Sequence, residues 1–182
     1  MTATASLSRR SLLACASLLA GTRAMAATPA LDAPNVVVIS PLLVTSGQPT
    51  AASLGTLKAQ GFEADIYLAP PTVPDAVRDE QAIVERQGLS YLNIPIPFGE
   101  PAESHYEAFA AAMAQLAGRK VLVHCQVNMR ASSLVFLHRV IAGHEQPDKA
   151  YESVAKVWSP RGPWKALIQK LLRGHGIGFE PY

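Results

Sequence analysis

Short runs of apolar, often β-branched residues alternate along this chain with longer stretches whose apolar positions recur every three or four residues. Runs of the first kind are typical of buried strands, and stretches of the second kind are typical of amphipathic helices. Strands are expected at residues 36–39, 42–45, 64–68, 90–94 and 121–123. Helices are expected at 50–60, from 75 or 77 to 87, and at 103–117, 131–142, 147–157 and 163–173.

Turn and capping residues support these boundaries. Thr50 is suited to cap the first helix, and Gly61, Gly88 and Gly118 each follow the last periodic residue of a helix. Strands that alternate with helices indicate an α/β fold with a central, mainly parallel sheet flanked by helices. A length of 182 residues favours one folded domain, which we assign to residues 27–182.

The first 26 residues have the features of an export signal. Arg9 and Arg10 form a twin-arginine pair, the apolar stretch 12–21 follows at once, and residues 24–26 (Ala-Met-Ala) resemble a cleavage site. An apolar stretch of this length is too short to span a bilayer, which needs about 20 residues. We therefore expect export by the twin-arginine route, a mature protein that begins at Ala27 in the periplasm, and no membrane anchor after cleavage.

Charge and cysteine content narrow the function classes further. Three of the 16 basic residues lie in the acid-free leader, so the mature part, with 14 acidic residues, is close to neutral and has no basic patch for nucleic acid. Removal of the leader takes Cys15 with it and leaves Cys125 without a disulfide partner. No cluster of histidine, cysteine and acidic residues has metal-ligand spacing, so neither a metal nor a cofactor is expected.

The chemistry-bearing residues lie where a strand meets a helix. The segment 121–139 (VLVHCQVNMRASSLVFLHR) places Cys125 at the end of a buried strand, followed by a four-residue loop, and Arg130 opens a helix. Ligands of open α/β sheets bind at this edge, and the N–H groups of a helix N-terminus attract anions. The same field, together with the arginine, stabilises a thiolate. A nucleophilic thiolate beside a guanidinium suits attack on phosphorus or sulfur.

The His-Cys…Arg signature resembles the cysteine-dependent protein tyrosine and dual-specificity phosphatases. Residues 46–49 (SGQP), 66–70 (IYLAP) and 91–95 (YLNIP) add a likeness to the bacterial beta-lactamase-hydrolase-like, phosphatase-like domain over roughly residues 35–173. The resemblance implies that Cys125 is the nucleophile and that Arg130 clamps the phosphate. The residues it implies around the substrate are His124, Gln126, Val127, Asn128, Met129, Ala131 and Ser132.

Two departures keep alternatives open. Phosphatases of this class have five residues between cysteine and arginine, whereas four stand here, and the usual loop glycine is missing. Asn128 is therefore expected to adopt the left-handed conformation. Ala131 stands where those phosphatases have Ser or Thr, so Ser132 or Ser133 would have to substitute. The short loop also resembles rhodanese-type sulfurtransferases, whose cysteine carries a persulfide.

A general acid is also needed to protonate the leaving oxygen. The loop 95–103 after the fourth strand contains no aspartate, so Glu100 is the first candidate, Glu103 the second and His105 an outside candidate. The acidic residues Asp75, Asp79 and Glu80 are assigned to a solvated helix start. The segment 158–164, with both tryptophans and Arg161, is interpreted as a packed turn, with a pocket wall as the alternative.

The sequence thus predicts an exported phosphoric monoester hydrolase that acts through a phosphocysteine intermediate on a phosphorylated protein or a small phosphoester. The alternatives are a rhodanese-like sulfurtransferase, with Arg130 holding an anionic sulfur donor, and a non-catalytic oxyanion-binding module.

Overall fold

The computed structural model describes residues 1–2 and 31–182 of the chain. The predicted signal segment and its cleavage site therefore lie outside the described residues. Within residues 31–182, no helix combines the length and the apolar character needed to cross a membrane.

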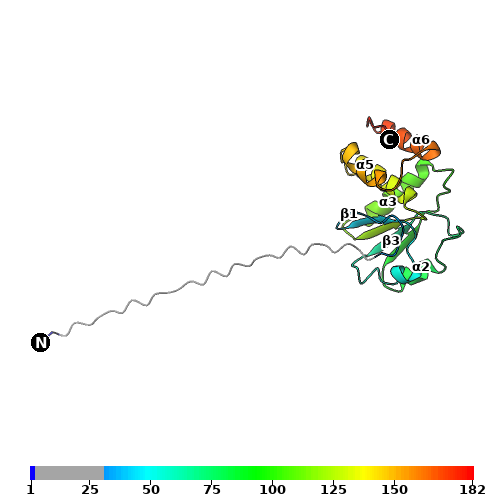
Figure 1. Cartoon of the computed structure of the whole chain (residues 1–182). Helices are drawn as coiled ribbons and strands as arrows, with labels where there is room; N and C mark the ends of the chain where they lie inside the picture. Colours follow the sequence, from blue (N-terminus) through cyan, green and yellow to red (C-terminus); the bar gives the residue numbers. More distant parts are fainter. Residues whose placement is uncertain (3–30) are drawn as a thin grey trace.

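One five-stranded sheet forms the centre of the fold (Figure 1). Its strands are β1 (Val37–Ser40), β2 (Leu43–Ser46), β3 (Ala64–Tyr67), β4 (Ser90–Asn93) and β5 (Val121–His124). The order across the sheet is β1-β2-β5-β3-β4, with β1 antiparallel to β2 and every other pair parallel. The predicted α/β fold with a mainly parallel sheet is confirmed, and each expected strand agrees to within a residue or two.

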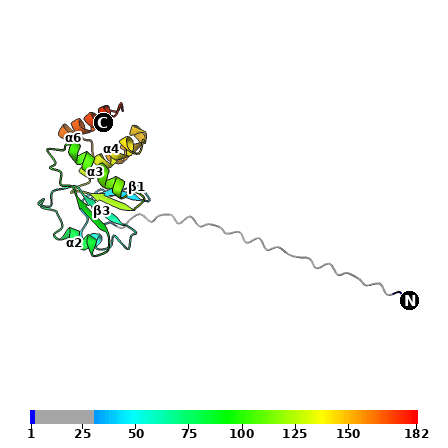
Figure 2. The same ribbon diagram turned by 180° about the vertical axis from the view of Figure 1, so that it is seen from behind.

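Helices cover both faces of the sheet, as the two opposite views show (Figures 1 and 2). The helices are α1 (Ala51–Leu54), α2 (Glu80–Glu85), α3 (Glu103–Gln115), α4 (Met129–Ile141), α5 (Pro147–Ala155) and α6 (Gly162–Gly174). The larger buried cluster joins the sheet to α3–α6, and the smaller one joins it to α1 and α2. The β5 side chains, alternating along a strand, enter both clusters, as expected for a strand buried on both faces.

Two predicted helices depart from the expected elements. The first, expected at 50–60, is only the four-residue α1, followed by turns through Gly61. The second differs at its start. Its start at residue 75 or 77 was wrong, because α2 begins only at Glu80 and the preceding segment is irregular. Asp79, immediately before the helix, has a left-handed backbone (φ 60°), a conformation that cannot continue a right-handed helix. The segment 69–79 is therefore a long loop at the C-terminal edge of the sheet, where it reaches the residues that follow β5.

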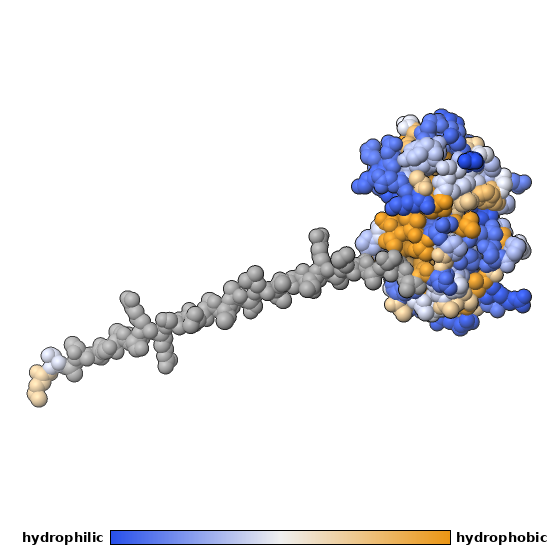
Figure 3. Space-filling view, in the orientation of Figure 1, coloured by the Kyte–Doolittle hydropathy of each residue, from blue (hydrophilic) through white to orange (hydrophobic). Residues whose placement is uncertain are grey.

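The antiparallel edge of the sheet exposes apolar residues. Hydrophobic residues gather on the surface in the region of β1 (Figure 3), where Val38 and Leu42 are each 47% exposed. Two strands, β2 and β5, lie between β1 and β3.

Candidate active site

The loop from Cys125 to Asn128, called the catalytic loop below for its proposed role, follows the central strand of the sheet. β5 lies between β2 and β3, with His124 opposite Ser46 on one side and Tyr67 on the other. Cys125 is the first residue after the strand, and α4 begins four residues later. Because the neighbouring strands are parallel, their following loops meet at the same edge, so residues 47–48 and 68–79 surround Cys125 and the loop after it.

The segment after β2 supports this loop through main-chain contacts. Gln48 N–H donates to the carbonyl of Gln126 at 3.0 Å, and Gly47 forms a bridge with Val127. Cys125 N–H in turn donates to the carbonyl of Ser46 at 3.3 Å. Residues 46–48 therefore hold the backbone of residues 125–127 in place through main-chain contacts.

Gly47 is required by this close approach. A Cβ at this position would lie 2.8 Å from the carbonyl oxygen of Gln126 and 3.0 Å from Pro34. We expect Gly47→Ala to lower stability by about 1–3 kcal/mol, as overpacking does, and to reduce turnover because the loop must shift. Thermal melting and initial rates measure both effects. Gly178→Ala, where nothing lies within 4 Å, is the matched control. Equal melting temperatures and rates in the two variants would show that residues 46–48 do not support the loop after Cys125.

Asn128 takes the left-handed conformation predicted from the missing glycine. Its φ is 70°, and its buried side-chain amide donates to the carbonyl of Asn35 at 2.6 Å and to Thr45 Oγ1 at 3.0 Å. Asparagine tolerates this region because a short polar side chain can form such local bonds. The four-residue spacing is thus compatible with a sharp turn into α4.

Arg130 is held in position on three sides. Its side chain is only 3% exposed, Nε donates to the carbonyl of Ile96 at 2.9 Å, and one terminal nitrogen donates to Gln126 Oε1 at 3.3 Å. The guanidinium carbon also lies 5.1 Å from the centre of the Phe98 ring. These contacts hold the guanidinium between the loop after β4 and the loop that contains Cys125.

The remaining predicted loop residues have structural roles around the start of α4. Cys125 is a free thiol that is fully buried, and Ala131 is buried as well. The hydroxyls of Ser132 and Ser133 both donate to the carbonyl of Met129, at 3.2 and 2.9 Å. Val127, by contrast, is 40% exposed at the tip of the loop. The serine hydroxyls are therefore bound to the helix backbone in this state.

His124 belongs to a buried ionic cluster that the sequence reasoning missed. Its Nε2 lies 3.3 Å from Asp65 Oδ1 and 3.1 Å from Glu80 Oε1, and its ring stacks on Tyr67. Burial alone lowers the pKa of His124, but the two carboxylates outweigh it and raise the pKa to about 10. Burial raises the pKa of Asp65, opposed by the charge of His124. The cluster therefore keeps a charged imidazolium directly behind the catalytic loop.

The assignment of Glu80 to a solvated helix start was wrong. Glu80 is 5% exposed, and its second carboxylate oxygen accepts a hydrogen bond of 2.6 Å from Gln48 Nε2. The imidazolium charge makes this burial possible. Asp65 is the residue from which the sequence could have revealed this cluster, since a charged residue inside an otherwise apolar strand requires a partner. Ligand atoms of Asp65, Glu80 and His124 lie within 4.8 Å of one another and have the composition of a metal site. The raised pKa of His124 favours an imidazolium, whose charge offsets one of the two carboxylates.

The acid candidates predicted from the sequence lie around the loop after β4. Glu103 forms an ion pair of 2.9 Å with Lys170, and His105 Nδ1 accepts a hydrogen bond from Ala102 N–H at 3.0 Å. Glu100 is exposed, and its backbone N–H closes a turn onto Pro97. The role of Glu100 as an acid stays a prediction. An unexpected carboxylate reaches the catalytic loop instead: Asp75 Oδ1 accepts a hydrogen bond of 2.7 Å from Gln126 Nε2.

The tryptophan segment packs onto the same loop. Trp164 Nε1 donates to the carbonyl of Phe98 at 2.8 Å, and both Trp158 and Trp164 lie with ring centres about 6 Å from Phe98. Because Phe98 lies over Arg130, this aromatic cluster also helps to hold the guanidinium in place from the side of α6. The predicted packed turn therefore also packs behind Phe98 and Arg130, while Arg161 is exposed at the start of α6.

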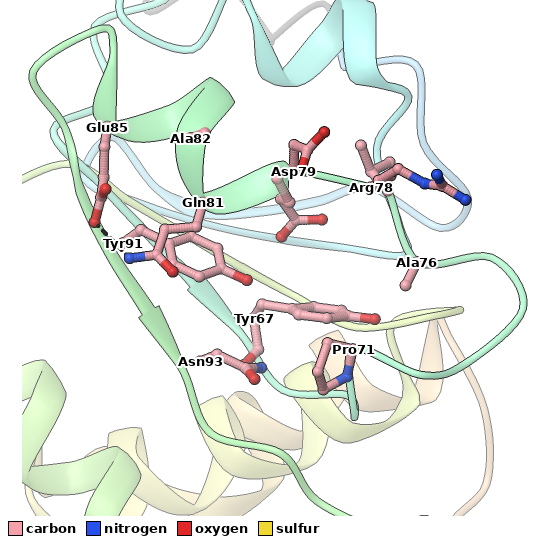
Figure 4. Close-up of a pocket in the computed structure, with 12 residues that line it drawn as sticks. Tyr67, Pro71, Ala76, Arg78, Asp79, Gln81, Ala82, Glu85, Tyr91 and Asn93 are labelled. Carbon is pink, nitrogen blue, oxygen red and sulfur yellow. Dashed lines mark hydrogen bonds between the residues drawn. The ribbon is translucent and has the colours of Figure 1, made fainter.

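A cavity of about 560 Å³ lies beside the ionic cluster (Figure 4). Tyr67 and Tyr91 border it from β3 and β4, and Arg78 and Asp79 border it from the segment before α2 (Figure 4). Glu80 also lines the cavity and thereby joins it to His124. Its lining residues come from the 69–79 loop, α2, β3 and β4.

Sequence relatives cover the part of the chain that forms this site. A "Beta-lactamase hydrolase-like protein" from Xylella fastidiosa is 35% identical over 121 residues, and one from Agrobacterium fabrum is 32% identical over 116 residues. These alignments cover 63% and 62% of this chain but 27% and 26% of the relatives, so the match spans about a quarter of their length. A scan against models of protein families finds no match.

Solved structures extend the likeness to nearly the whole described fold. A candidate phosphatase of the DUF442 family from Shewanella putrefaciens CN-32 is 30% identical, with a TM-score of 0.73 over 79% of this chain and 95% of that chain. A variant of TpbA from P. aeruginosa in complex with phosphotyrosine has a TM-score of 0.61 over 86% of this chain and 100% of that chain. At 17% identity, this second likeness concerns the fold.

Proposed function

The chain belongs to the DUF442 family of phosphatase-like proteins, and from that premise we propose that it is a cysteine-dependent phosphoric monoester hydrolase. The observation that carries the proposal is the placement of Cys125 and Arg130 at the two ends of one short loop between β5 and the first turn of α4. A nucleophile, a guanidinium and a helix N-terminus then face the same small volume.

In the proposed mechanism the Cys125 thiolate attacks phosphorus. The Sγ–P bond forms while the P–O bond to the leaving group breaks, and the leaving oxygen takes a proton from a general acid. Arg130 and the loop N–H groups stabilise the charge on the three equatorial oxygens. Water then attacks the phosphocysteine, the P–Sγ bond breaks, and inorganic phosphate is released.

The arrangement of the site supports two parts of this mechanism. Cys125 lies four residues before the N-terminus of α4, whose free N–H groups attract an anion. Arg130 is already ordered by Ile96, Gln126 and Phe98, so little conformational entropy is lost when it binds an anion. The phosphotyrosine held by the structurally similar TpbA variant supports a phosphoester as substrate, either on a protein or as a small molecule.

The proposed function is tested by two assays in parallel on the mature protein. Incubation with p-nitrophenyl phosphate should release p-nitrophenol, and rapid acid quenching should trap a phosphorylated Cys125 peptide in the mass spectrum. Thiosulfate with cyanide should produce no thiocyanate. Thiocyanate without phosphate release would establish the sulfurtransferase alternative, and phosphate binding without any turnover would establish a non-catalytic module.

We also propose that residues 1–26 direct export through the twin-arginine route. The mature protein recovered from the periplasm should begin at Ala27, as N-terminal sequencing can show. Replacement of Arg9 and Arg10 by lysine should leave full-length precursor in the cytoplasm, because this route reads the arginine pair and not charge alone. Lysine replacement of Arg23, which lies outside the pair, is the control. Normal processing of the double variant would rule out this route.

A further inference from the structure

We infer that Asp75, on the loop between β3 and α2, is the general acid of the proposed phosphatase reaction. The inference rests on the proposed function and assigns its proton donor to a different loop from the one after β4. Asp75 lies 50 residues before Cys125 in the sequence, but the parallel arrangement of β3 and β5 brings the loops that follow them together.

The first argument is direct contact with the reactive loop. Gln126 follows the nucleophile, and its side-chain amide bridges two groups: Oε1 accepts from Arg130 at 3.3 Å, and Nε2 donates to Asp75 Oδ1 at 2.7 Å. One amide therefore sets the distance between the phosphate clamp and the carboxyl group. The carboxyl group of Asp75 also lies at the protein surface, where a substrate can reach it.

The second argument comes from Tyr67, which reports on the charges around it independently of that hydrogen bond. Burial raises the pKa of Tyr67; the charges of Glu80, Asp75 and Cys125 raise it further, and that of Arg130 lowers it. Asp75, Cys125 and Arg130 are therefore all close enough to Tyr67 for their charges to act on its hydroxyl. This agrees with the placement of Asp75 that the hydrogen bond to Gln126 shows.

The third argument is that the other acid candidates have different contacts. Glu103 is paired with Lys170, and His105 accepts the Ala102 N–H at the start of α3. Glu100 is exposed, as Asp75 is, but within residues 31–182 no side-chain hydrogen bond joins Glu100 to the loop after Cys125. Among these carboxyl groups, Asp75 is the one joined to a loop residue next to Cys125.

The proton balance follows from this placement. In the first step, protonated Asp75 gives its proton to the leaving oxygen as the Sγ–P bond forms, and becomes a carboxylate. In the second step, the carboxylate takes a proton from the water that attacks phosphorus, as the P–Sγ bond breaks. Asp75 is then protonated again, and Cys125 leaves as the thiolate with which the cycle began.

The test compares three single variants on two substrates. Asp75→Asn removes the proton but keeps an oxygen that accepts from Gln126, so a purely structural role would be preserved. Glu100→Gln tests the rival acid. Asp79→Asn is the matched control, since its side chain makes no capping hydrogen bond and asparagine tolerates its left-handed backbone. Thermal melting confirms that each variant folds.

Leaving-group dependence separates an acid from a positioning residue. Phenyl phosphate releases a phenol with a pKa of about 10, whereas 2,4-dinitrophenyl phosphate releases a far more acidic one that needs no proton. We expect Asp75→Asn to lower kcat/KM for phenyl phosphate by roughly 10²–10⁴-fold and to leave kcat/KM for the dinitrophenyl ester within about threefold of the wild type. The ratio kcat/KM reports the steps through cleavage of the P–O bond, whereas hydrolysis of the phosphocysteine, which also uses Asp75, is the same for both esters. Asp79→Asn should match the wild type on both substrates.

Each outcome decides the assignment. The same selective loss in Glu100→Gln, with none in Asp75→Asn, would move the acid to the loop after β4. An equal loss of kcat/KM on both substrates in Asp75→Asn would make Asp75 a structural residue and overturn the inference. A wild-type protein that hydrolyses neither ester and forms no phosphocysteine would instead refute the proposed function itself.

Discussion

Cys125→Ser is expected to abolish aryl phosphate turnover, with a loss on the order of 10³-fold or more, while affinity for inorganic phosphate is retained. Serine has nearly the same shape, and Cys125 is fully buried, so the loop that binds the oxyanion should persist. What disappears is the nucleophile, because a hydroxyl in this position has no general base beside it. Initial rates and a phosphate-dependent rise in melting temperature measure the two quantities.

The matched control for this variant is Ser104→Cys, which adds an exposed thiol on α3 without changing the nucleophile. Its turnover should stay close to that of the wild type. Phosphate transfer to a residue other than Cys125, or full activity in Cys125→Ser, would show that the reaction does not pass through this thiol.

Arg130→Lys is expected to lose both affinity and rate, with turnover lower by roughly 10²–10³-fold, as for loss of an oxyanion donor. The guanidinium makes three contacts at once, with the Ile96 carbonyl, Gln126 Oε1 and the face of Phe98. An ammonium is a point charge that cannot reproduce a planar fork, so it cannot keep these contacts and grip two phosphate oxygens as well. Steady-state kinetics and phosphate titration measure the loss.

Arg173→Lys, at the exposed end of α6, makes the same chemical change outside the site and should leave both quantities unchanged. Because Arg130 is buried, thermal melting must accompany the kinetics so that lost activity is separated from lost folding. A folded Arg130→Lys protein with wild-type affinity and rate would place the guanidinium outside the reaction.

Local features of the site could be predicted because they depend on neighbouring residues. A β-branched strand that runs into His124-Cys125 fixes the nucleophile at a strand end, and the missing glycine requires a left-handed residue, which is Asn128. By contrast, the second helix was placed too early, because periodicity in the 75–87 stretch does not reveal that Asp79 turns the chain out of the helical region.

The sequence by itself therefore determined the alternation of strands and helices, the loop from Cys125 to Arg130 and the conformation within it, since each depends on contacts a few residues apart. Only the tertiary structure decided what surrounds that loop. The order β1-β2-β5-β3-β4 brings Asp65, Glu80 and Asp75 to the central strand from positions 45 to 60 residues earlier. The loops that follow parallel strands lie at the same edge of the sheet, although long crossover segments separate them in the sequence. No local sequence pattern shows which of these loops will be in contact.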